Sequence, residues 1–161
     1  MPDPIRKIAL SRYAAQRLAA HPELAAEVDA TRDARAPFSA AEIARALEGA
    51  RSDGEAAFKR RLRRLRQRVL LRTMARDLAG DMRNPANLAE VCQATSDLAE
   101  LTIRASLDWL GDAELIVVAM GKLGGRELNV SSDIDLVFVY PEEGDTDGAR
   151  KIENHEYFLH L

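Results

Sequence analysis

The chain has 161 residues, of which 47% are hydrophobic and 30% are charged, with a formal net charge of −3. This composition is typical of a soluble globular protein, and no apolar run is long enough to cross a bilayer. The single cysteine, Cys92, excludes an intrachain disulfide and favours a location in the reducing cytoplasm.

The first helices are predicted from the residues at their boundaries. Up to about residue 110 the spacing of apolar residues is helical. Pro4 is expected to open a first helix, which His21 and Pro22 interrupt. A serine followed three residues later by a glutamate has the spacing of a capping box, which marks the start of a helix. This spacing occurs twice, at Ser39 with Glu42 and at Ser52 with Glu55.

The helix predicted after Ser52 combines one apolar stripe with a run of arginines. The stripe consists of Phe58, Leu62, Leu65 and Val69. Residues 59–68 include seven basic residues, which could bind nucleic acid or an acidic partner, but no aromatic side chains are interleaved for base stacking. Residues 1–80 hold 17 Lys and Arg against 10 Asp and Glu, whereas residues 81–161 hold 6 against 16. We therefore expect a solvated helix face, or one that is ion-paired with the acidic second half.

A further amphipathic helix is predicted after the break at Asn84 and Pro85, and it is expected to end near Gly111. Its apolar face is predicted to consist of Leu88, Val91, Cys92, Thr95, Leu98 and Ala99. Together these elements predict a helical region over residues 1–111. Aromatic residues within it, Tyr13 and Trp109, are assigned to packing. His155 and His160 have the wrong spacing for one helical face, so no zinc site is expected.

The pattern changes from helix to strand after residue 111. Two short β-branched, apolar runs predict buried strands, at residues 115–120 and 134–140. A single helical turn is expected between them at residues 126–128. Residues 112–161 are therefore predicted to form the first strands of a second domain. The sequence ends within an apparent element, so we expect it to be a fragment.

A glycine-rich segment lies between these apolar runs, and two aspartates lie at the start of the second run. Asp133 and Asp135 are expected at the start of the second strand, on one face and about 6–7 Å apart. Two such carboxylates can hold a divalent metal, which would offset the repulsion between them. Glycines let the backbone approach a phosphate closely, and a serine can add a hydroxyl hydrogen bond. The candidates are Gly121, Gly124, Gly125 and Ser132. This combination favours metal-assisted phosphoryl or nucleotidyl transfer over the alternative of solvated aspartates at a strand end.

The segment from Gly121 to Leu136, GKLGGRELNVSSDIDL, closely resembles the signature of the glutamine synthetase adenylyltransferase/adenylyl-removing enzyme family. That family consists of large bacterial proteins with two nucleotidyltransferase-fold domains related to DNA polymerase β. The resemblance implies an α+β fold, in which an N-terminal helical bundle is followed by the start of a DNA polymerase β-like nucleotidyltransferase sheet.

The resemblance also implies the roles of the site residues. Asp133 and Asp135 would be catalytic residues that bind Mg²⁺. The nucleotide or phosphate would be bound by Gly121, Lys122, Gly124, Gly125 and Ser132. ATP or ADP and phosphate are implied as substrates or products, with glutamine synthetase and a PII-type signal protein as partners. No nucleic acid and no membrane are implied as partners.

The stretch LNVSSD at residues 128–133, and the long helical region before it, resemble the N-terminal half of the family. That half removes AMP from a tyrosine of glutamine synthetase by phosphorolysis and releases ADP, whereas the C-terminal half adds AMP from ATP. Lys122 departs from the superfamily pattern, which commonly has Gly or Ser there. A third metal-binding carboxylate is expected beyond residue 161, so the fragment is expected to be inactive.

Two other functions stay open at this point. The chain could be a helical module whose basic helix binds nucleic acid. It could also be a nucleotidyltransferase that acts on an antibiotic or an RNA end, because the metal- and phosphate-binding groups would look the same.

Overall fold

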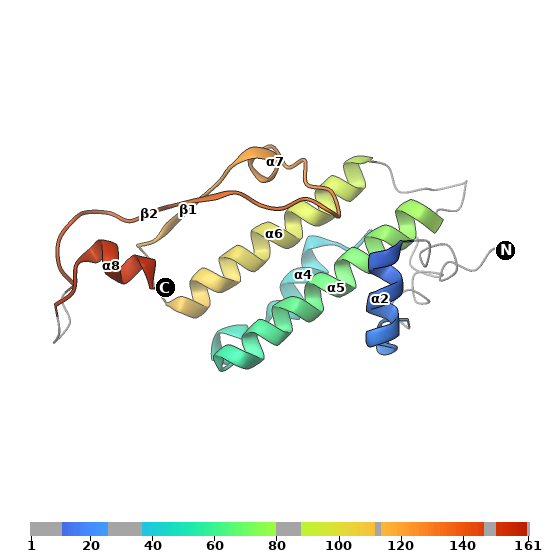
Figure 1. Cartoon of the computed structure of the whole chain (residues 1–161), viewed down its shortest axis with the longest axis horizontal. Helices are drawn as coiled ribbons and strands as arrows, with labels where there is room; N and C mark the ends of the chain where they lie inside the picture. The colour runs from blue at the N-terminus through green and yellow to red at the C-terminus, as the bar shows by residue number, and fades with distance from the viewer. Residues whose placement is uncertain (1–10, 26–36, 80–87, 112–113, 147–150, 161) are drawn as a thin grey trace.

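The computed structural model describes residues 11–25, 37–79, 88–111, 114–146 and 151–160 (Figure 1). Within these residues the chain is an α+β protein, in which a helical bundle precedes a two-stranded antiparallel sheet. The α+β fold class predicted from the sequence is therefore confirmed. None of the helices in these ranges has the length and apolarity that a bilayer-spanning segment requires.

The helices begin and end close to the predicted boundary residues. Helix α2 (Arg12–Ala20) ends with His21 as its C-cap, as the His21-Pro22 break predicts. The helix start predicted at Pro4 lies outside the described residues. Helix α4 (Ala40–Leu47) begins with the predicted capping box, in which the Ser39 amide donates to Glu42 Oε2 at 2.9 Å and the Glu42 amide donates to Ser39 Oγ at 3.3 Å.

The capping box predicted at Ser52 is wrong. Ser52 ends a short 3₁₀ turn, η1 (Ala50–Ser52), and helix α5 (Glu55–Ala79) begins three residues later. The Glu55 carboxylate instead accepts a hydrogen bond from Lys59 Nζ at 2.5 Å, one turn further along the helix. The spacing alone does not distinguish these two uses of the glutamate.

The helices pack around two apolar clusters, both of which include residues of α5. The first joins α4, α5 and α6 (Leu88–Leu110) through Phe38, Ile43, Leu65, Val69 and Leu98. The second joins α2 to the C-terminal part of α5 through Ala14, Leu24, Leu71, Met74 and Ala75. Helix α6 ends at the predicted position, because Gly111 takes the left-handed conformation with φ of 74°.

Most of the two predicted apolar stripes is buried in this core. On α5, Phe58, Leu65 and Val69 are buried, while Leu62 is half-buried. On α6, the assignment of Leu88 to the apolar face is wrong, because its side chain is 76% exposed in the first turn. The packing role assigned to Trp109 is confirmed: its ring stacks on Phe58 with centroids 5.1 Å apart, and its Nε1 donates to the Asp53 carbonyl at 2.7 Å.

Two of the basic residues in 59–68 form ion pairs with carboxylates of the helical region. Lys59 pairs with Glu55, and Arg61 Nε donates to Asp53 Oδ2 at 2.7 Å. The hydrogen bond from Arg61 holds the pKa of Asp53 below its ordinary value. Both acidic partners belong to residues 1–80, so for these two basic residues the expected pairing with the acidic second half is wrong.

The sheet consists of β1 (Ile116–Ala119) and β2 (Leu136–Val139), paired antiparallel with Ile116 opposite Val139. Both strands are shorter than predicted, and the prediction that they are buried is wrong, since Ile116 and Phe138 are each 59% exposed. The helical turn between them is α7 (Gly121–Gly124), which lies five residues before the predicted position. Helix α8 (Asn154–Leu159) follows, and the hairpin lies along α6 on the side away from α4 and α5 (Figure 1). The domain boundary between residues 111 and 112 stays a prediction.

The capping box of α4 makes stability depend on pH. Burial alone would raise the pKa of Glu42, but hydrogen bonds from Ser39 and Arg72 hold it below its ordinary value of 4.5. A carboxylate whose pKa is lower in the folded state than in the unfolded state stabilises the folded protein. This contribution is complete above the unfolded-state pKa and is lost as the pH falls through the folded-state pKa. We expect Glu42→Gln to lower the free energy of unfolding by about 1 kcal/mol near neutral pH, and by less at about pH 3. Urea unfolding at both pH values measures this, and an equal loss at both would contradict it.

Candidate active site

The glycine-rich turn packs tightly against the end of β1. Gly121 has a left-handed φ of 52°, which favours glycine. A Cβ added at Gly124 would lie only 2.7 Å from the Ala119 carbonyl oxygen. The turn is closed by bonds from the Gly124 amide to the Met120 carbonyl and from the Gly125 amide to the Gly121 carbonyl, each 3.1 Å long. Glycine at position 124 therefore lets α7 fold back onto β1.

The two aspartates lie at the same end of the hairpin as this turn. They were predicted at the start of the second strand, but β2 begins at Leu136, directly after Asp135, so neither aspartate belongs to it. The Met120 amide still donates to the Asp135 carbonyl at 2.9 Å, which holds Asp135 opposite the start of the turn. A Cβ at Gly121 would lie 3.6 Å from Asp135 Oδ2, so this carboxylate stands beside the glycine turn. Asp133 and Asp135 are both exposed.

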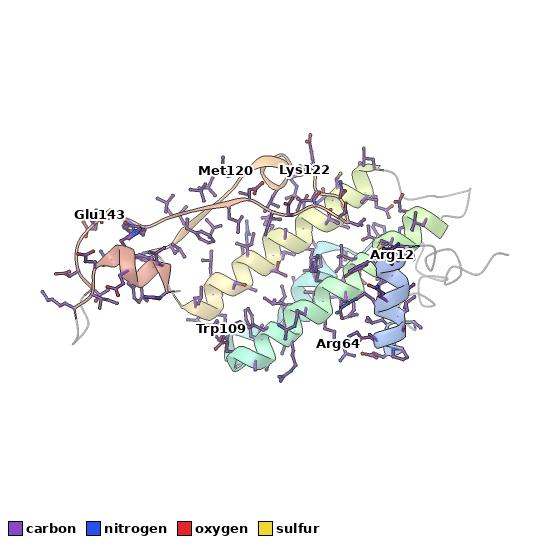
Figure 2. The ribbon with its side chains drawn as sticks, in the orientation of Figure 1. Arg12, Arg64, Trp109, Met120, Lys122 and Glu143 are labelled. Atoms are coloured by element: carbon purple, nitrogen blue, oxygen red, sulfur yellow. The ribbon has the colours of Figure 1, made fainter. Side chains whose placement is uncertain are left out.

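The remaining predicted binding residues surround these groups. Lys122 is exposed on α7, and Figure 2 shows it with Met120 at this end of the hairpin. The Ser132 hydroxyl accepts a hydrogen bond from the Asn129 amide at 3.1 Å, which closes the turn that leads into Asp133. The amides of Gly124 and Gly125 are bonded within the turn, and Gly124 also packs closely against the backbone of β1.

A large groove opens beside Asp133, between the hairpin and helices α5 and α6. Its volume is about 1130 Å³, and most of its lining is apolar. Asn129, Ser132 and Asp133 line it together with Arg63 and Arg66 from α5. The sequence reasoning assigned those two arginines to a solvated or ion-paired face and did not place them near the site.

The donor set suits magnesium. Carboxylate oxygens are the protein ligands that Mg²⁺ prefers, and it commonly takes only one or two of them together with waters and substrate phosphates. Asp133 and Asp135 supply two. In the described part of the chain, no group of three His, Cys, Asp or Glu residues could hold a metal ion. The two aspartates therefore supply donors of the kind that Mg²⁺ takes.

Helix α6 also contacts the site, which the sequence reasoning missed. Arg126 Nη1 donates to Glu100 Oε2 at 2.7 Å, and Arg126 Nη2 donates to Asp97. These hydrogen bonds raise the pKa of the Arg126 guanidinium, and the bond to Asp97 has the larger effect. Thr95 Oγ1 lies 2.5 Å from the Leu128 carbonyl oxygen. These partners are 26 to 33 residues apart, so no local pattern marks them.

Comparison with known proteins gives the family. The family model described as glutamate-ammonia ligase adenylyltransferase matches residues 4–161. The chain belongs to this family. The resemblance inferred from the Gly121 to Leu136 segment is confirmed, and membership extends over the helical region as well.

Curated relatives carry the name bifunctional glutamine synthetase adenylyltransferase/adenylyl-removing enzyme. The relative from Chromobacterium violaceum is 43% identical over 97% of this chain and 19% of its own length. That from Aromatoleum aromaticum is 39% identical over 100% of this chain and 18% of its own length. That from Nitrosomonas eutropha is 50% identical over 66% of this chain and 13% of its own length. The chain thus spans less than a fifth of the length of these relatives.

The tight packing of the glycine turn leads to a prediction about Gly124. We expect Gly124→Ala to weaken the hairpin by about 1–3 kcal/mol, because the new methyl group collides with a backbone carbonyl that cannot rotate away. The measurement is hydrogen exchange of the Met120 amide, whose bond to Asp135 closes the hairpin. Gly54→Ala is the matched control, since nothing lies within 4 Å of a Cβ there. Equal protection of the Met120 amide in the two variants would contradict the prediction.

Proposed function

We propose that this chain is the N-terminal part of an enzyme that removes AMP from a tyrosine of glutamine synthetase by phosphorolysis. The observation that carries the proposal is the exposed carboxylate pair beside the glycine turn, with Asp135 next to Gly121. Family membership and the names of the relatives support glutamine synthetase as the substrate. The LNVSSD stretch at residues 128–133 and the helices before it support the adenylyl-removing half.

The reaction defines what the site residues must do. An oxygen of inorganic phosphate attacks the phosphorus of the tyrosine-bound AMP, the bond from phosphorus to the tyrosine oxygen breaks, and the products are ADP and free tyrosine hydroxyl. Asp133 and Asp135 would hold Mg²⁺, which offsets negative charge on the phosphoryl oxygens when bound. The Lys122 ammonium would attract the incoming phosphate to the turn. The Met120 amide holds the backbone of Asp135 beside the turn, which would reduce the rearrangement needed for its carboxylate to hold Mg²⁺.

The two alternative functions have less support. Family membership argues against an antibiotic or an RNA end as the acceptor. Within the basic segment, Lys59 and Arg61 are already paired with carboxylates, which weakens the case for a nucleic-acid surface. A PII-type signal protein, ATP and a cytoplasmic location belong to the same proposal, and they depend on the family resemblance alone.

The test is an assay of a protein extended beyond residue 161 to the length of the relatives. Adenylylated glutamine synthetase is incubated with that protein, magnesium and phosphate, and release of ADP is measured. We expect ADP release that requires phosphate. A second assay without phosphate, with unmodified glutamine synthetase and ATP, measures AMP addition. To separate the two halves, both assays are repeated with Asp133→Asn. Loss of AMP addition with ADP release unchanged would contradict the proposed direction.

A further inference from the structure

Arg126 follows the glycine turn in an unusual backbone conformation. Its φ is 56°, in the left-handed region, and it is the only non-glycine residue with a positive φ in the described part of the chain. Residues with a Cβ adopt this region at an energetic cost, and they do so where surrounding contacts compensate. The residue directly follows the glycine turn, so whatever holds Arg126 also sets the direction of the chain toward Asp133.

The contacts of Arg126 come from a pair of carboxylates that α6 holds in place. Its guanidinium donates to Asp97 and Glu100, and charged hydrogen bonds of this kind are stronger than neutral ones. Asp97 also accepts from Gln93 Nε2 at 2.8 Å, and Glu100 pairs with Arg104 at 2.7 Å. Both carboxylates are therefore oriented by their own helix and present a preformed site for one guanidinium.

A second contact joins the same helix to the same loop two residues later. Thr95 Oγ1 lies 2.5 Å from the Leu128 carbonyl oxygen in a buried environment, and Leu128 itself is only 3% exposed. After Leu128, two hydrogen bonds between Asn129 and Ser132 close a turn that leads directly to Asp133. The Ser132 amide donates to the Asn129 carbonyl, and the Asn129 amide donates to the Ser132 hydroxyl. The segment from Arg126 to Asp133 thus begins with two contacts to α6 and continues through a hydrogen-bonded turn.

We propose that Arg126 and Thr95 are positioning residues, through which helix α6 fixes Asp133 relative to the glycine turn. This inference deepens the proposed function and rests on it, since the positioned groups are the carboxylates assigned to Mg²⁺. Neither residue touches the reacting groups. Their effect on the reaction would be to hold the backbone that leads into Asp133, while the Met120 amide holds Asp135 beside the glycine turn.

The first experiment measures the anchor itself, without metal or substrate. Arg126→Asn removes the guanidinium, and asparagine tolerates a left-handed φ better than most residues, so little backbone strain is added. We expect amide exchange over residues 127–133 to become at least about tenfold faster, with exchange in α4 and α5 unchanged. Arg104→Asn is the matched control, because Arg104 pairs with the same Glu100 but does not touch the loop. Equal exchange rates in the two variants would overturn the proposal.

The second experiment asks whether the anchor matters for the reaction. In the extended protein, we expect Arg126→Asn to raise the Mg²⁺ concentration needed for half-maximal ADP release at least about fivefold, with an unchanged melting temperature. Arg126→Lys is expected to restore part of the effect, because lysine keeps the charge but not the forked geometry. If Arg126→Asn does not fold, Thr95→Val tests the same segment through its other contact. An unchanged Mg²⁺ requirement alongside faster exchange would overturn the positioning role.

The two experiments allow failure of this inference to be distinguished from failure of the proposed function. If the extended protein with its natural sequence releases no ADP, the proposed function fails, and with it the assignment of these residues to that reaction. The exchange experiment still decides whether α6 holds the loop, because it needs neither magnesium nor glutamine synthetase.

Discussion

Replacing Asp133 with asparagine in a protein extended to the length of the relatives is expected to lower phosphate-dependent ADP release by about a thousandfold or more. Asparagine has nearly the same size and keeps one carbonyl oxygen, but it lacks the negative charge that binds Mg²⁺. Loss of the metal removes several kcal/mol of charge stabilisation from the transition state, and about 1.4 kcal/mol corresponds to a factor of ten in rate. Asp135→Asn is expected to have a similar effect, because its carboxylate lies beside Gly121 at the glycine turn.

The control for this prediction is Asp108→Asn. Asp108 is also an exposed aspartate, but it lies near the C-terminal end of α6, beyond Asp97 and Glu100, the α6 residues that bind Arg126. We expect this variant to keep full activity, which shows that the loss is specific to the pair. Thermal unfolding of all three variants should give similar melting temperatures, since none of these side chains is buried. Full activity of Asp133→Asn would remove the basis of the proposed function.

The helical part of the fold was largely predictable because its signals are local. The Ser39 and Glu42 capping box consists of contacts within one turn, so three-residue spacing was enough to predict it. The end of α6 was marked by Gly111, which takes the left-handed conformation that glycine favours. Where the same spacing had another local use, as for Glu55 and Lys59, the prediction was wrong.

The strands and the turn between them were predicted less well. A strand ends where its hydrogen-bonded partner ends, and apolar composition does not show this. The runs at 115–120 and 134–140 therefore predicted strands that were too long, and this placed the two aspartates at the start of the second strand, although β2 begins only after Asp135. The helical turn starts at Gly121 because Gly124 can pack against Ala119, a steric relation that sequence spacing does not reveal.

For the candidate site, the sequence predicted the elements next to one another in the chain but not the helix that supports them. The order of glycines and aspartates implied that Gly121 and Asp135 would be close, and Asp135 Oδ2 does lie against Gly121. The contacts from Arg126 to Asp97 and Glu100 depend on how α6 packs against the loop. The chain has many arginines and many carboxylates, and the sequence alone does not show which of them form ion pairs with each other.

A second large effect is expected at Arg76, which joins the end of α5 to the start of α6. Arg76 Nη2 donates to Glu90 Oε2 at 2.8 Å, and Arg76 Nε donates to the other carboxylate oxygen. Both side chains are largely buried, at 8% and 17% exposure, and the hydrogen bonds to Glu90 raise the pKa of Arg76. Truncating one partner of such a pair leaves the other charge poorly solvated, which typically costs about 3–5 kcal/mol.

We therefore expect Arg76→Ala to lower the free energy of unfolding by about 3 kcal/mol, measured by urea unfolding followed by helical circular dichroism. Lys59→Ala is the matched control: its pair with Glu55 is 59% and 64% exposed, so the change should cost at most about 1 kcal/mol. Adding Glu90→Gln to Arg76→Ala should recover part of the loss, because a neutral amide is less costly to bury than an unpaired carboxylate. If Arg76→Ala and Lys59→Ala lower the free energy of unfolding by the same amount, burial does not strengthen the Arg76 pair, and the prediction is wrong.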